Sequence, residues 1–324
     1  MKEQYVRDLA DGAQVDSVFA LHSRDIRSAR TGDAFLSLEV GDSTGRMPAV
    51  MFRPSPLEEA LPVGSVVRVC GRATTYRGSR RITVESLRPV ESYDIADLLP
   101  SGTRDRAELL EELRALVRRV RDARLRAVVR AVFGGPGFIE TFATCPAGSG
   151  RHHAYVGGLL EHTVAVATLC LSLSASYPQV DADLLLAAAL LHDVGKTEEL
   201  ACGTSLDYTD AGRMIGHVVL GERMVRRAIE AQAHPVSDET AMRLSHALLA
   251  HHGAPEWGAP RSPVTIEALL LHHADNLDAQ ASAFLGAVSG AAVLEQAWSD
   301  GANGFGRPLM VPGCSCGREQ RDCA

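Results

Sequence analysis

The sequence predicts a multidomain chain in which an N-terminal β-barrel precedes an all-α domain. Three observations support this division. Residues 14–90 alternate apolar and polar side chains in short runs separated by turn residues, which is typical of β-strands. From Phe138 onward, apolar residues recur at helical spacing. The chain has 324 residues, 46% of them hydrophobic, which is enough for two domains with cores of their own.

The barrel is predicted from the number and length of its strands. The alternation is clearest at residues 35–40 and 67–71, and the segment 42–45 (DSTG) has the composition of a tight turn between two strands. Five short strands in fewer than about 90 residues favour a small closed barrel, most simply an OB-fold. We therefore predict an OB-fold nucleic-acid-binding domain over residues 1–91.

A basic stretch in the second half of this barrel is the candidate nucleic-acid surface. OB-folds hold single strands in a basic groove in which bases stack on aromatic rings. Residues 68–88 contain six arginines and one acidic residue. A run of arginines is more often only a solvated face, so it does not establish RNA binding alone. We predict nucleic-acid contacts from Arg72, Tyr76, Arg77, Arg80 and Arg81.

A connector and a helical linker are predicted for residues 92–137. An apolar stripe at helical spacing runs along residues 109–132, and Thr103 or Asp105 is placed to cap its start. Arginines cover the other face, either as a solvated surface or as an extension of the nucleic-acid groove. At the far end of the chain, residues 301–324 form a cysteine-containing tail for which disorder is one expectation.

The all-α domain, predicted over residues 138–300, is organised around the segment 184–196 (LLLAAALLHDVGK). Here an apolar run that should form a buried helix ends in His192 and Asp193. Burying an imidazole beside a carboxylate costs free energy unless a partner compensates, and a metal cation is the usual one. Five more residues complete the pattern H…HD…H…HH…D: His162, His217, His251, His252 and Asp275. This pattern resembles the HD superfamily of metal-dependent phosphohydrolases.

Longer motifs narrow the resemblance. The chain contains, in order, HHAYVGGLLEHTV, LLHDVGKTEEL, GHVVLGERM, AHHGAPEWGAP and EALLLHHADNLDAQ. With the barrel and the linker, these motifs resemble the YhaM family of 3′→5′ exoribonucleases over most of residues 14–280. Met51 and Phe52 stand where a tryptophan-bearing strand is expected in that family, and the tail also departs from it.

The resemblance implies a site for two metal ions. One ion would be held by His162, His192, Asp193 and Asp275, and Asp193 would bridge to a second held by His217, His251 and His252. Imidazoles with a few carboxylates suit Mn, Fe, Co, Ni or Zn better than Mg, so two divalent transition-metal ions are the expected cofactors. Two such ions can activate water and stabilise both oxygens of an in-line phosphoryl displacement. Asp193 and Lys196 are the expected catalytic residues, the lysine as a compact positive charge near the phosphate.

Three further residues are weaker candidates. His152 and His153 precede the first ligand-bearing helix, where they either contact substrate or serve in capping and loop packing. Asp278 lies one helical turn after Asp275 and is expected to support a ligand rather than to bind the metal. Helical geometry turns the histidine pair just before Asp275 to other faces, so we exclude it.

The charge distribution predicts that the two halves of the chain bind different ligands. Net charge is +1 over residues 1–91, +4 over 104–130 and −10 over 131–324. An acidic half repels polyanions but supplies carboxylates for metal, so nucleic acid should bind mainly to the N-terminal part.

No apolar run approaches the roughly 20 residues needed to span a bilayer, the N-terminus does not resemble a signal peptide, and the scattered cysteines suit a reducing cytosol. We expect a cytoplasmic protein without membrane contact, for which a homo-oligomer is compatible with the sequence.

Three functions remain open from the sequence. The first is a metal-dependent 3′→5′ exoribonuclease that releases nucleoside monophosphates from single-stranded RNA, or also from DNA; the polarity and the choice of RNA come only from the resemblance. The second is a hydrolase of small cyclic or free nucleotides with a regulatory OB domain. The third is a non-catalytic nucleic-acid-binding protein with a structural metal site, against which the complete ligand set and Lys196 argue.

Overall fold

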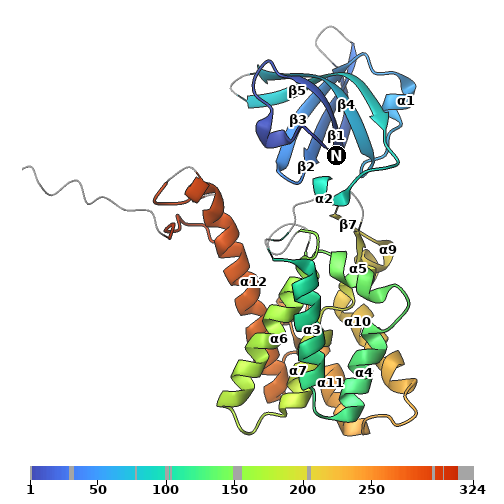
Figure 1. Ribbon diagram of the computed structural model, residues 1–324, viewed down its shortest axis with the longest axis vertical. Helices are drawn as coiled ribbons and strands as arrows, with labels where there is room; N and C mark the ends of the chain where they lie inside the picture. The colour runs from blue at the N-terminus through green and yellow to red at the C-terminus, as the bar shows by residue number, and fades with distance from the viewer. Residues whose placement is uncertain are drawn as a thin grey trace, which may run out of the picture. The chain divides into compact units, whose positions relative to one another are not determined.

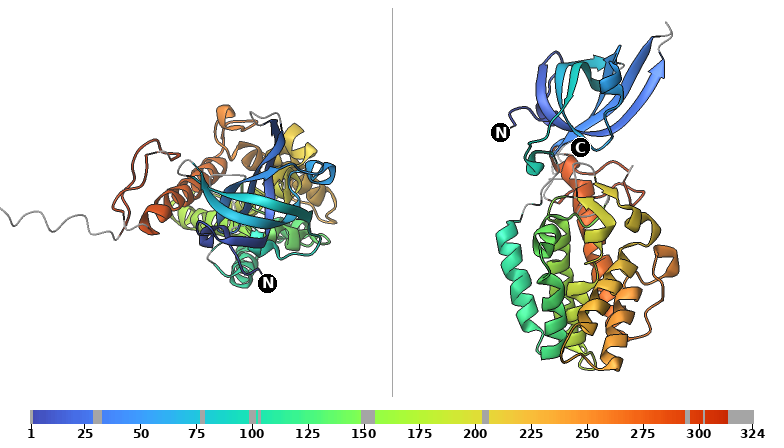
Figure 2. Two further views of the ribbon diagram at one scale, coloured as in Figure 1. Left: turned by 90° about the horizontal axis from the view of Figure 1, so that it is seen from above. Right: turned by 90° about the vertical axis from the view of Figure 1, so that its right-hand side faces the viewer.

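The computed structural model describes residues 2–28, 33–76, 79–98, 102, 104–148, 155–202, 206–293, 296–301 and 303–312. The chain falls into two compact units. One comprises Met1–Thr103 with Leu200–Arg213, and the other comprises Arg104–Glu199 with Met214–Ala324. The first is built around β-strands and the second around α-helices (Figures 1 and 2).

The first unit contains a closed barrel of five strands in the order β1-β2-β3-β5-β4. These are β1 (Gln14–Ser28), β2 (Ala34–Asp42), β3 (Gly45–Phe52), β4 (Val66–Tyr76) and β5 (Ser79–Pro89). β3 and β5 pair in parallel, and the other neighbours pair antiparallel. The unit also contains η1 (Val6–Asp8), α1 (Pro56–Glu59), α2 (Ile95–Leu98), a hairpin of β6 (Leu200–Cys202) and β7 (Leu206–Tyr208), and most of α9 (Asp210–Met214). The predicted OB-fold barrel is confirmed.

Strand alternation explains why this segment closes into a barrel. Alternate residues along the strands turn inward, and the fully buried apolar side chains include Phe19, Leu36, Val67, Val69 and Ile82. The predicted turn after β2 is anchored by the buried Asp42, which accepts hydrogen bonds from the backbone N–H and the hydroxyl of Thr44. The same carboxylate pairs with the buried Lys2 Nζ at 2.7 Å.

The second unit is a bundle of α-helices (Figure 1). Its elements are α3 (Arg106–Arg119), α4 (Ala123–Phe133), α5 (Phe138–Thr144), α6 (Gly158–Ser176), α7 (Ala182–Leu191), α8 (Lys196–Glu199), α10 (His217–Glu230), α11 (Asp238–Ala250), η2 (Pro255–Trp257) and α12 (Ile266–Val293). Side chains of Asp105, Asp122 and Asp181 cap α3, α4 and α7. α7 is buried on every side from Leu184 onward, as predicted, so it carries its C-terminal residues into the interior.

The helices predicted as a linker belong to this bundle. The stripe expected over residues 109–132 forms two helices, α3 and α4, separated at residues 120–122. α3 packs against α6 and α7, and α4 packs against α7 and α10. Periodicity predicts such helices, but it does not identify the partner that their apolar stripe packs against.

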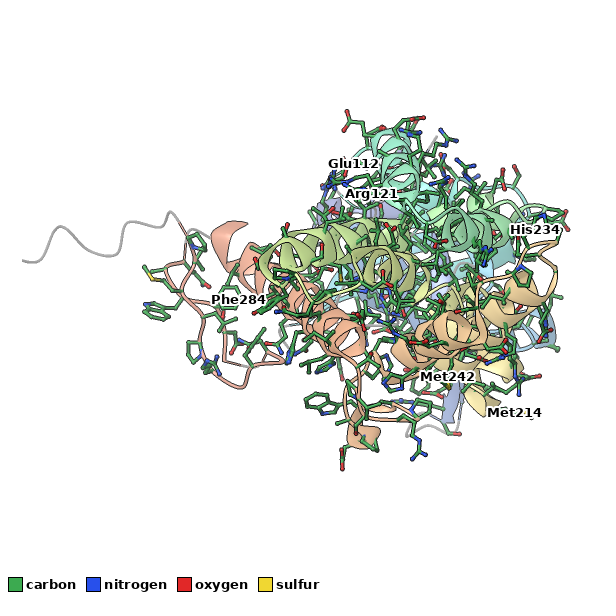
Figure 3. All side chains as sticks on the ribbon, turned by 90° about the horizontal axis from the view of Figure 1, so that it is seen from below. Glu112, Arg121, Met214, His234, Met242 and Phe284 are labelled. Atoms are coloured by element: carbon green, nitrogen blue, oxygen red, sulfur yellow. The ribbon has the colours of Figure 1, made fainter. Side chains whose placement is uncertain are left out.

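The first part of the predicted tail is folded. Leu309 and Val311 are buried against Val288 of α12, and the ring of Phe305 lies 5.6 Å from that of Phe284. Figure 3 labels Phe284 on α12. Residues 313–324, with the three cysteines of the tail, lie outside the described residues.

Among the described helices, α6 is long and apolar enough to cross a membrane by length and composition. It has 19 residues, a mean hydropathy of 1.4 and half of its apolar window buried. The structure differs here from the expectation that no apolar run approaches this length. α6 packs against α7 and α12 and buries His162, which is the arrangement of a core helix.

Candidate metal centre

One group of metal donors surrounds the end of α7. His162, in the second turn of α6, and His192, directly after α7, place their Nε2 atoms 3.2 Å apart. The Oδ2 atom of Asp193 lies 3.4 Å from His162 Nε2 and 3.3 Å from His192 Nε2. Asp275 of α12 adds its Oδ1 atom at 3.2 Å from His162 Nε2. These four side chains converge as the resemblance implies.

A second group of donors faces the other oxygen of Asp193. His217 is the first residue of α10, while His251 and His252 follow α11. The Oδ1 atom of Asp193 lies 3.5 Å from His217 Nε2 and 3.7 Å from His251 Nε2. The Nε2 atoms of His217 and His252 are 3.2 Å apart. The structure therefore brings all seven predicted ligands together, and Asp193 presents one oxygen to each group.

Hydrogen bonds behind the imidazoles turn their Nε2 lone pairs into the site. His192 and His251 each place Nδ1 against the carbonyl oxygen three residues earlier, at 2.8 and 2.6 Å. Carbonyls only accept, so both Nδ1 atoms carry the proton. His162 Nδ1 donates to Asp278 at 2.7 Å. In their neutral forms, His162 and His192 thus face each other with two lone pairs and no proton between them, an arrangement that a cation stabilises.

Buried polar atoms of the site also fit a bound cation. Within the described part of the chain, Asp193 Oδ1, His251 Nε2 and His252 Nδ1 are buried without a hydrogen-bond partner. Leaving a buried polar group unsatisfied costs about 1–3 kcal/mol. Asp193 Oδ1 and His251 Nε2 both face the second donor group, so a metal ion there would satisfy both. The donor set fits a divalent transition metal.

Charge and burial favour the metal-binding protonation states of Asp193 and His251 but not that of His162. Burial lowers the pKa of His251 well below its ordinary value, which keeps the imidazole neutral. Burial opposes ionisation of Asp193, but Lys196, His192 and His162 together outweigh it and hold the pKa of Asp193 well below the usual range. At His162, three neighbouring carboxylates outweigh burial and raise the pKa well above its ordinary value. A proton therefore competes with metal at His162.

Lys196 is buried beside Asp193. Its Nζ atom lies 2.6 Å from Asp193 Oδ2, and its side chain is 10% exposed. Burial opposes the charged ammonium, but Asp193 outweighs it and raises the pKa of Lys196. Lys196 is therefore not a solvated surface residue. The only other lysine of the chain, Lys2, is likewise buried against an aspartate, Asp42.

Glu199 is a site residue that the sequence analysis did not identify. Its carboxylate accepts hydrogen bonds from the backbone N–H of His217 at 3.0 Å and from His217 Nδ1 at 2.9 Å. Burial opposes ionisation, but these bonds outweigh it and lower the pKa of Glu199. Glu199 orients His217 as Asp278 orients His162. The two partners are 18 positions apart and follow no motif spacing, so no pattern in the sequence connects them.

Four of the five predicted nucleic-acid residues lie on β4 and β5: Arg72, Tyr76, Arg80 and Arg81. Tyr76 is 50% exposed, and the guanidinium of Arg81 lies 4.2 Å from its ring centroid. Arg72 is exposed on β4, whereas Arg80 Nη1 donates to the backbone carbonyl of Leu9, which follows η1, at 3.0 Å. Arg77 lies outside the described residues.

The barrel also has an exposed aromatic ring that is not among the predicted contacts. Phe52 is 54% exposed, and its ring lies 5.9 Å from that of Phe35 on the neighbouring strand. The weaker candidates His152 and His153 lie outside the described residues, so the structure does not place them.

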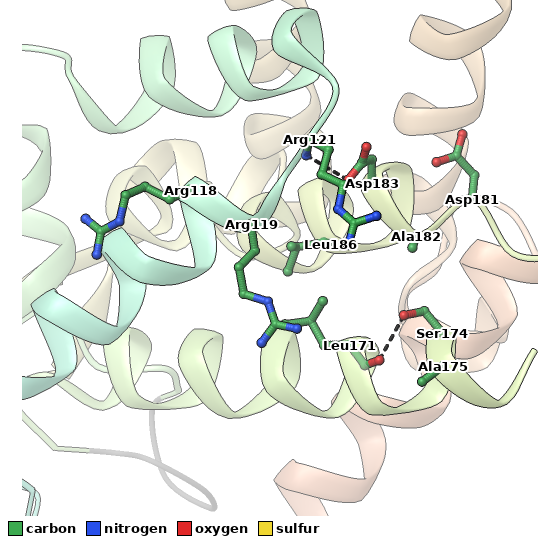
Figure 4. A pocket seen from close by; sticks show the side chains of 10 residues that line it. All are labelled: Arg118, Arg119, Arg121, Leu171, Ser174, Ala175, Asp181, Ala182, Asp183 and Leu186. Carbon is green, nitrogen blue, oxygen red and sulfur yellow. Dashed lines mark hydrogen bonds between the residues drawn. The ribbon is translucent and has the colours of Figure 1, made fainter.

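A cavity of about 450 Å³ elsewhere in the helical unit does not belong to the metal centre (Figure 4). It is lined by the end of α3, the last turns of α6 and the start of α7, including Arg118, Arg119 and Arg121. Ser174 in its wall follows His162 by 12 positions on α6, or about 18 Å along the helix axis. Both oxygens of the lining Asp183 accept backbone N–H groups, so this carboxylate is already satisfied.

Comparisons with known proteins agree with this architecture. The HD domain family matches residues 159–280, and the family described as OB-fold nucleic acid binding domain matches residues 21–90. The 3′-5′ exoribonuclease YhaM of Bacillus velezensis is 31% identical over 83% of this chain and 86% of its own length. The YhaM of Halalkalibacterium halodurans is 32% identical over 83% and 84%. A domain of replication protein A from Methanococcus maripaludis covers 28% of this chain and 96% of its own, with 15% identity and a TM-score of 0.24.

An OB-fold domain joined to an HD domain with a histidine–aspartate metal site defines a metal-dependent hydrolase of the HD class. The sequence identity to the relatives, and the share of the chain that they cover, define the family within this class. The chain belongs to the YhaM family of 3′-5′ exoribonucleases.

Proposed function

We propose that this chain is a metal-dependent 3′-5′ exoribonuclease that hydrolyses single-stranded RNA to nucleoside monophosphates. The observation that carries the proposal is the pair of donor groups sharing Asp193, in a chain that also contains a nucleic-acid-binding OB-fold. The printed activity of the relatives supports it.

The donor geometry supports two divalent transition-metal ions, drawn from Mn, Fe, Co, Ni and Zn. His162, His192, Asp193 and Asp275 would hold one, and Asp193, His217, His251 and His252 the other. Bound ions supply Lewis acidity toward a phosphoryl oxygen and lower the pKa of water. The chain contributes the rest: fixed tautomers, an ionised Asp193 with both oxygens in use, and a buried interior.

The two supporting carboxylates allow a test of the two-ion arrangement. Glu199→Gln and Asp278→Asn are each expected to weaken one metal-binding step by about 10–100-fold, because each orients an imidazole of a different group. Calorimetric titration of the metal-free proteins should show one weakened and one unchanged step in each variant. If both steps weakened equally in both variants, the division into two groups would be wrong.

Lys196 is proposed to offset negative charge at the phosphate as well as at Asp193. Lys196→Ala is expected to lower turnover by about 10²-fold at saturating metal, because it removes a preorganised charge. Lys196→Arg should recover only part of the loss. The guanidinium restores the positive charge, but it is planar and needs more room than an ammonium. Turnover and metal content are measured together. A rate within twofold of the parent for both variants would contradict this role.

The barrel is proposed to bind the strand that the metal centre hydrolyses. Tyr76→Ala is expected to weaken single-stranded RNA binding by about 5–150-fold, the range for one stacked base, and to leave hydrolysis of a small phosphodiester unchanged. RNA affinity should also fall with salt, as counterion release requires. Anisotropy titrations of labelled RNA measure both effects. Equal loss on RNA and on the small substrate would instead assign Tyr76 a structural role.

The main competing function is hydrolysis of small cyclic or free nucleotides. One experiment separates the two: metal-loaded protein is incubated with 5′-labelled RNA, matching DNA, and a panel of nucleotides. The proposed function predicts stepwise shortening of the 5′-labelled RNA with release of nucleoside monophosphates. Rapid turnover of a nucleotide with intact RNA would establish the alternative, and the DNA arm determines whether single-stranded DNA is also a substrate.

A further inference from the structure

The exposed indole of Trp257 lies on the segment that leaves the second donor group. Trp257 ends η2, five residues after His252, and 63% of its surface is exposed. One ring face is covered by His272, with the ring centroids 5.8 Å apart and the planes 25° apart. A ring stacked on one face and largely exposed has its other face open to a ligand.

The contacts behind this indole tie it to the metal donors. His272 is buried, and its Nδ1 donates to the carbonyl oxygen of His251 at 2.9 Å. Gly253 leaves no room for a side chain, because a Cβ atom there would lie 2.4 Å from the His272 ring. A Cβ atom at Gly258 would lie 3.5 Å from His252 Nδ1. The indole, the imidazole beneath it and the ligand pair therefore form one packed block.

The backbone of this segment is fixed as well. Trp257 N donates to Ala254 O at 3.0 Å, Ala254 N to His252 O at 3.1 Å, and Ala259 N to Ala254 O at 3.2 Å. A single exposed apolar side chain needs no functional explanation by itself. Here, however, the ring stacks on His272, which is bonded to the backbone of His251, and it lies on a hydrogen-bonded segment, so a ligand stacking on it would order little further chain.

We propose that Trp257 forms a nucleobase subsite, in which the open face of the indole stacks on a base of the strand whose phosphate is at the metal centre. The inference rests on the proposed function and adds a binding residue to it. Every base has a π-face, so the subsite takes single-stranded nucleotides without sequence preference. Stacking also suits this part of the chain, because the net charge of −10 over residues 131–324 gives phosphates little attraction.

The test compares Trp257→Ala with the parent on two RNAs, one normal and one abasic at its three 3′-terminal nucleotides. Trp257→Ala is expected to lower kcat/KM about 10-fold on the normal RNA and to leave the slower abasic RNA unchanged. Trp257→Phe should retain most of the activity. Trp298→Ala is the matched control, because Trp298 is the only other tryptophan, is 54% exposed and lies near the end of the chain.

A binding measurement separates the subsite from the proposed activity. With Trp298→Phe, Trp257 is the only tryptophan, and its fluorescence in the metal-loaded protein should be quenched by adenosine monophosphate. The matched Trp257→Phe protein should show no such quenching. Equal losses on the two RNAs, or equal quenching in the two proteins, would overturn the subsite. A parent protein that hydrolyses no RNA would overturn the proposed function instead. The comparison of quenching in the two proteins would then still show whether Trp257 binds a base.

Discussion

Asp193→Asn is expected to abolish metal binding and activity together. Asp193 presents one carboxylate oxygen to each donor group, so an amide, with a single neutral oxygen, can no longer serve both. We expect hydrolysis to fall by at least about 10³-fold. The change also leaves the buried Lys196 unpaired, which costs about 3–5 kcal/mol of the free energy of unfolding. Elemental analysis and rate measurements on the folded fraction check the prediction.

The chain offers a matched control in its other buried lysine–aspartate pair. Asp42→Asn breaks the pair with Lys2 in the barrel, so it should also lower stability. It should leave the metal content and the hydrolysis of a small phosphodiester unchanged. A combined Asp193→Asn and Lys196→Met variant, which removes the unpaired charge, should regain stability but no metal. Full metal content in the Asp193→Asn protein would show that the assigned ligand set is wrong.

Gly195→Ala is expected to disrupt the second donor group without replacing a ligand. A Cβ atom at Gly195 would lie 2.1 Å from His217 O and 2.5 Å from the backbone nitrogen of Gly221. Backbone atoms cannot yield as a flexible side chain does, so α10 must shift and carry His217 with it. Overpacking of this kind costs typically about 1–3 kcal/mol. Thermal unfolding should show the loss of stability, and metal titration should show weakened binding.

A helical glycine elsewhere serves as the control. Gly286 on α12 has no heavy atom within 4 Å of its ideal Cβ position. Gly286→Ala should therefore stabilise the protein by roughly 0.5–1 kcal/mol through helix propensity and leave metal binding intact. If Gly195→Ala behaved like Gly286→Ala, the close contact with α10 would not position His217.

The sequence predicts the site better than it predicts the packing around it. His192 and Asp193 could be proposed as ligands because they end an apolar run, where a buried imidazole and carboxylate need a common partner. The other five candidate ligands come from the resemblance to the HD pattern. The barrel could be predicted because alternation and turn residues are local signals. α3 and α4 were expected as a linker but pack in the helical bundle. A stripe of apolar residues shows that a helix packs against something, but not against which element.

The supporting residues could not be predicted for a related reason. Glu199 is hydrogen-bonded to His217, which is 18 positions further along the chain. The two residues are brought together because the chain folds back at α10, not because they lie one helical turn apart. His272 was excluded because its side chain leaves the face of Asp275, yet that direction brings it to His251 O and beneath Trp257. Sequence spacing detects neighbours on one helix, whereas these pairs form between separate elements.

Anomalous diffraction from crystals of the metal-loaded protein tests the central claim most directly. The account predicts two peaks, one within about 2.0–2.2 Å of the Nε2 atoms of His162 and His192 and the other at the same distance from those of His217, His251 and His252. Asp193 should contact both peaks, one with each oxygen. Peaks remote from these side chains, or none in a protein that hydrolyses RNA at full rate, would contradict it.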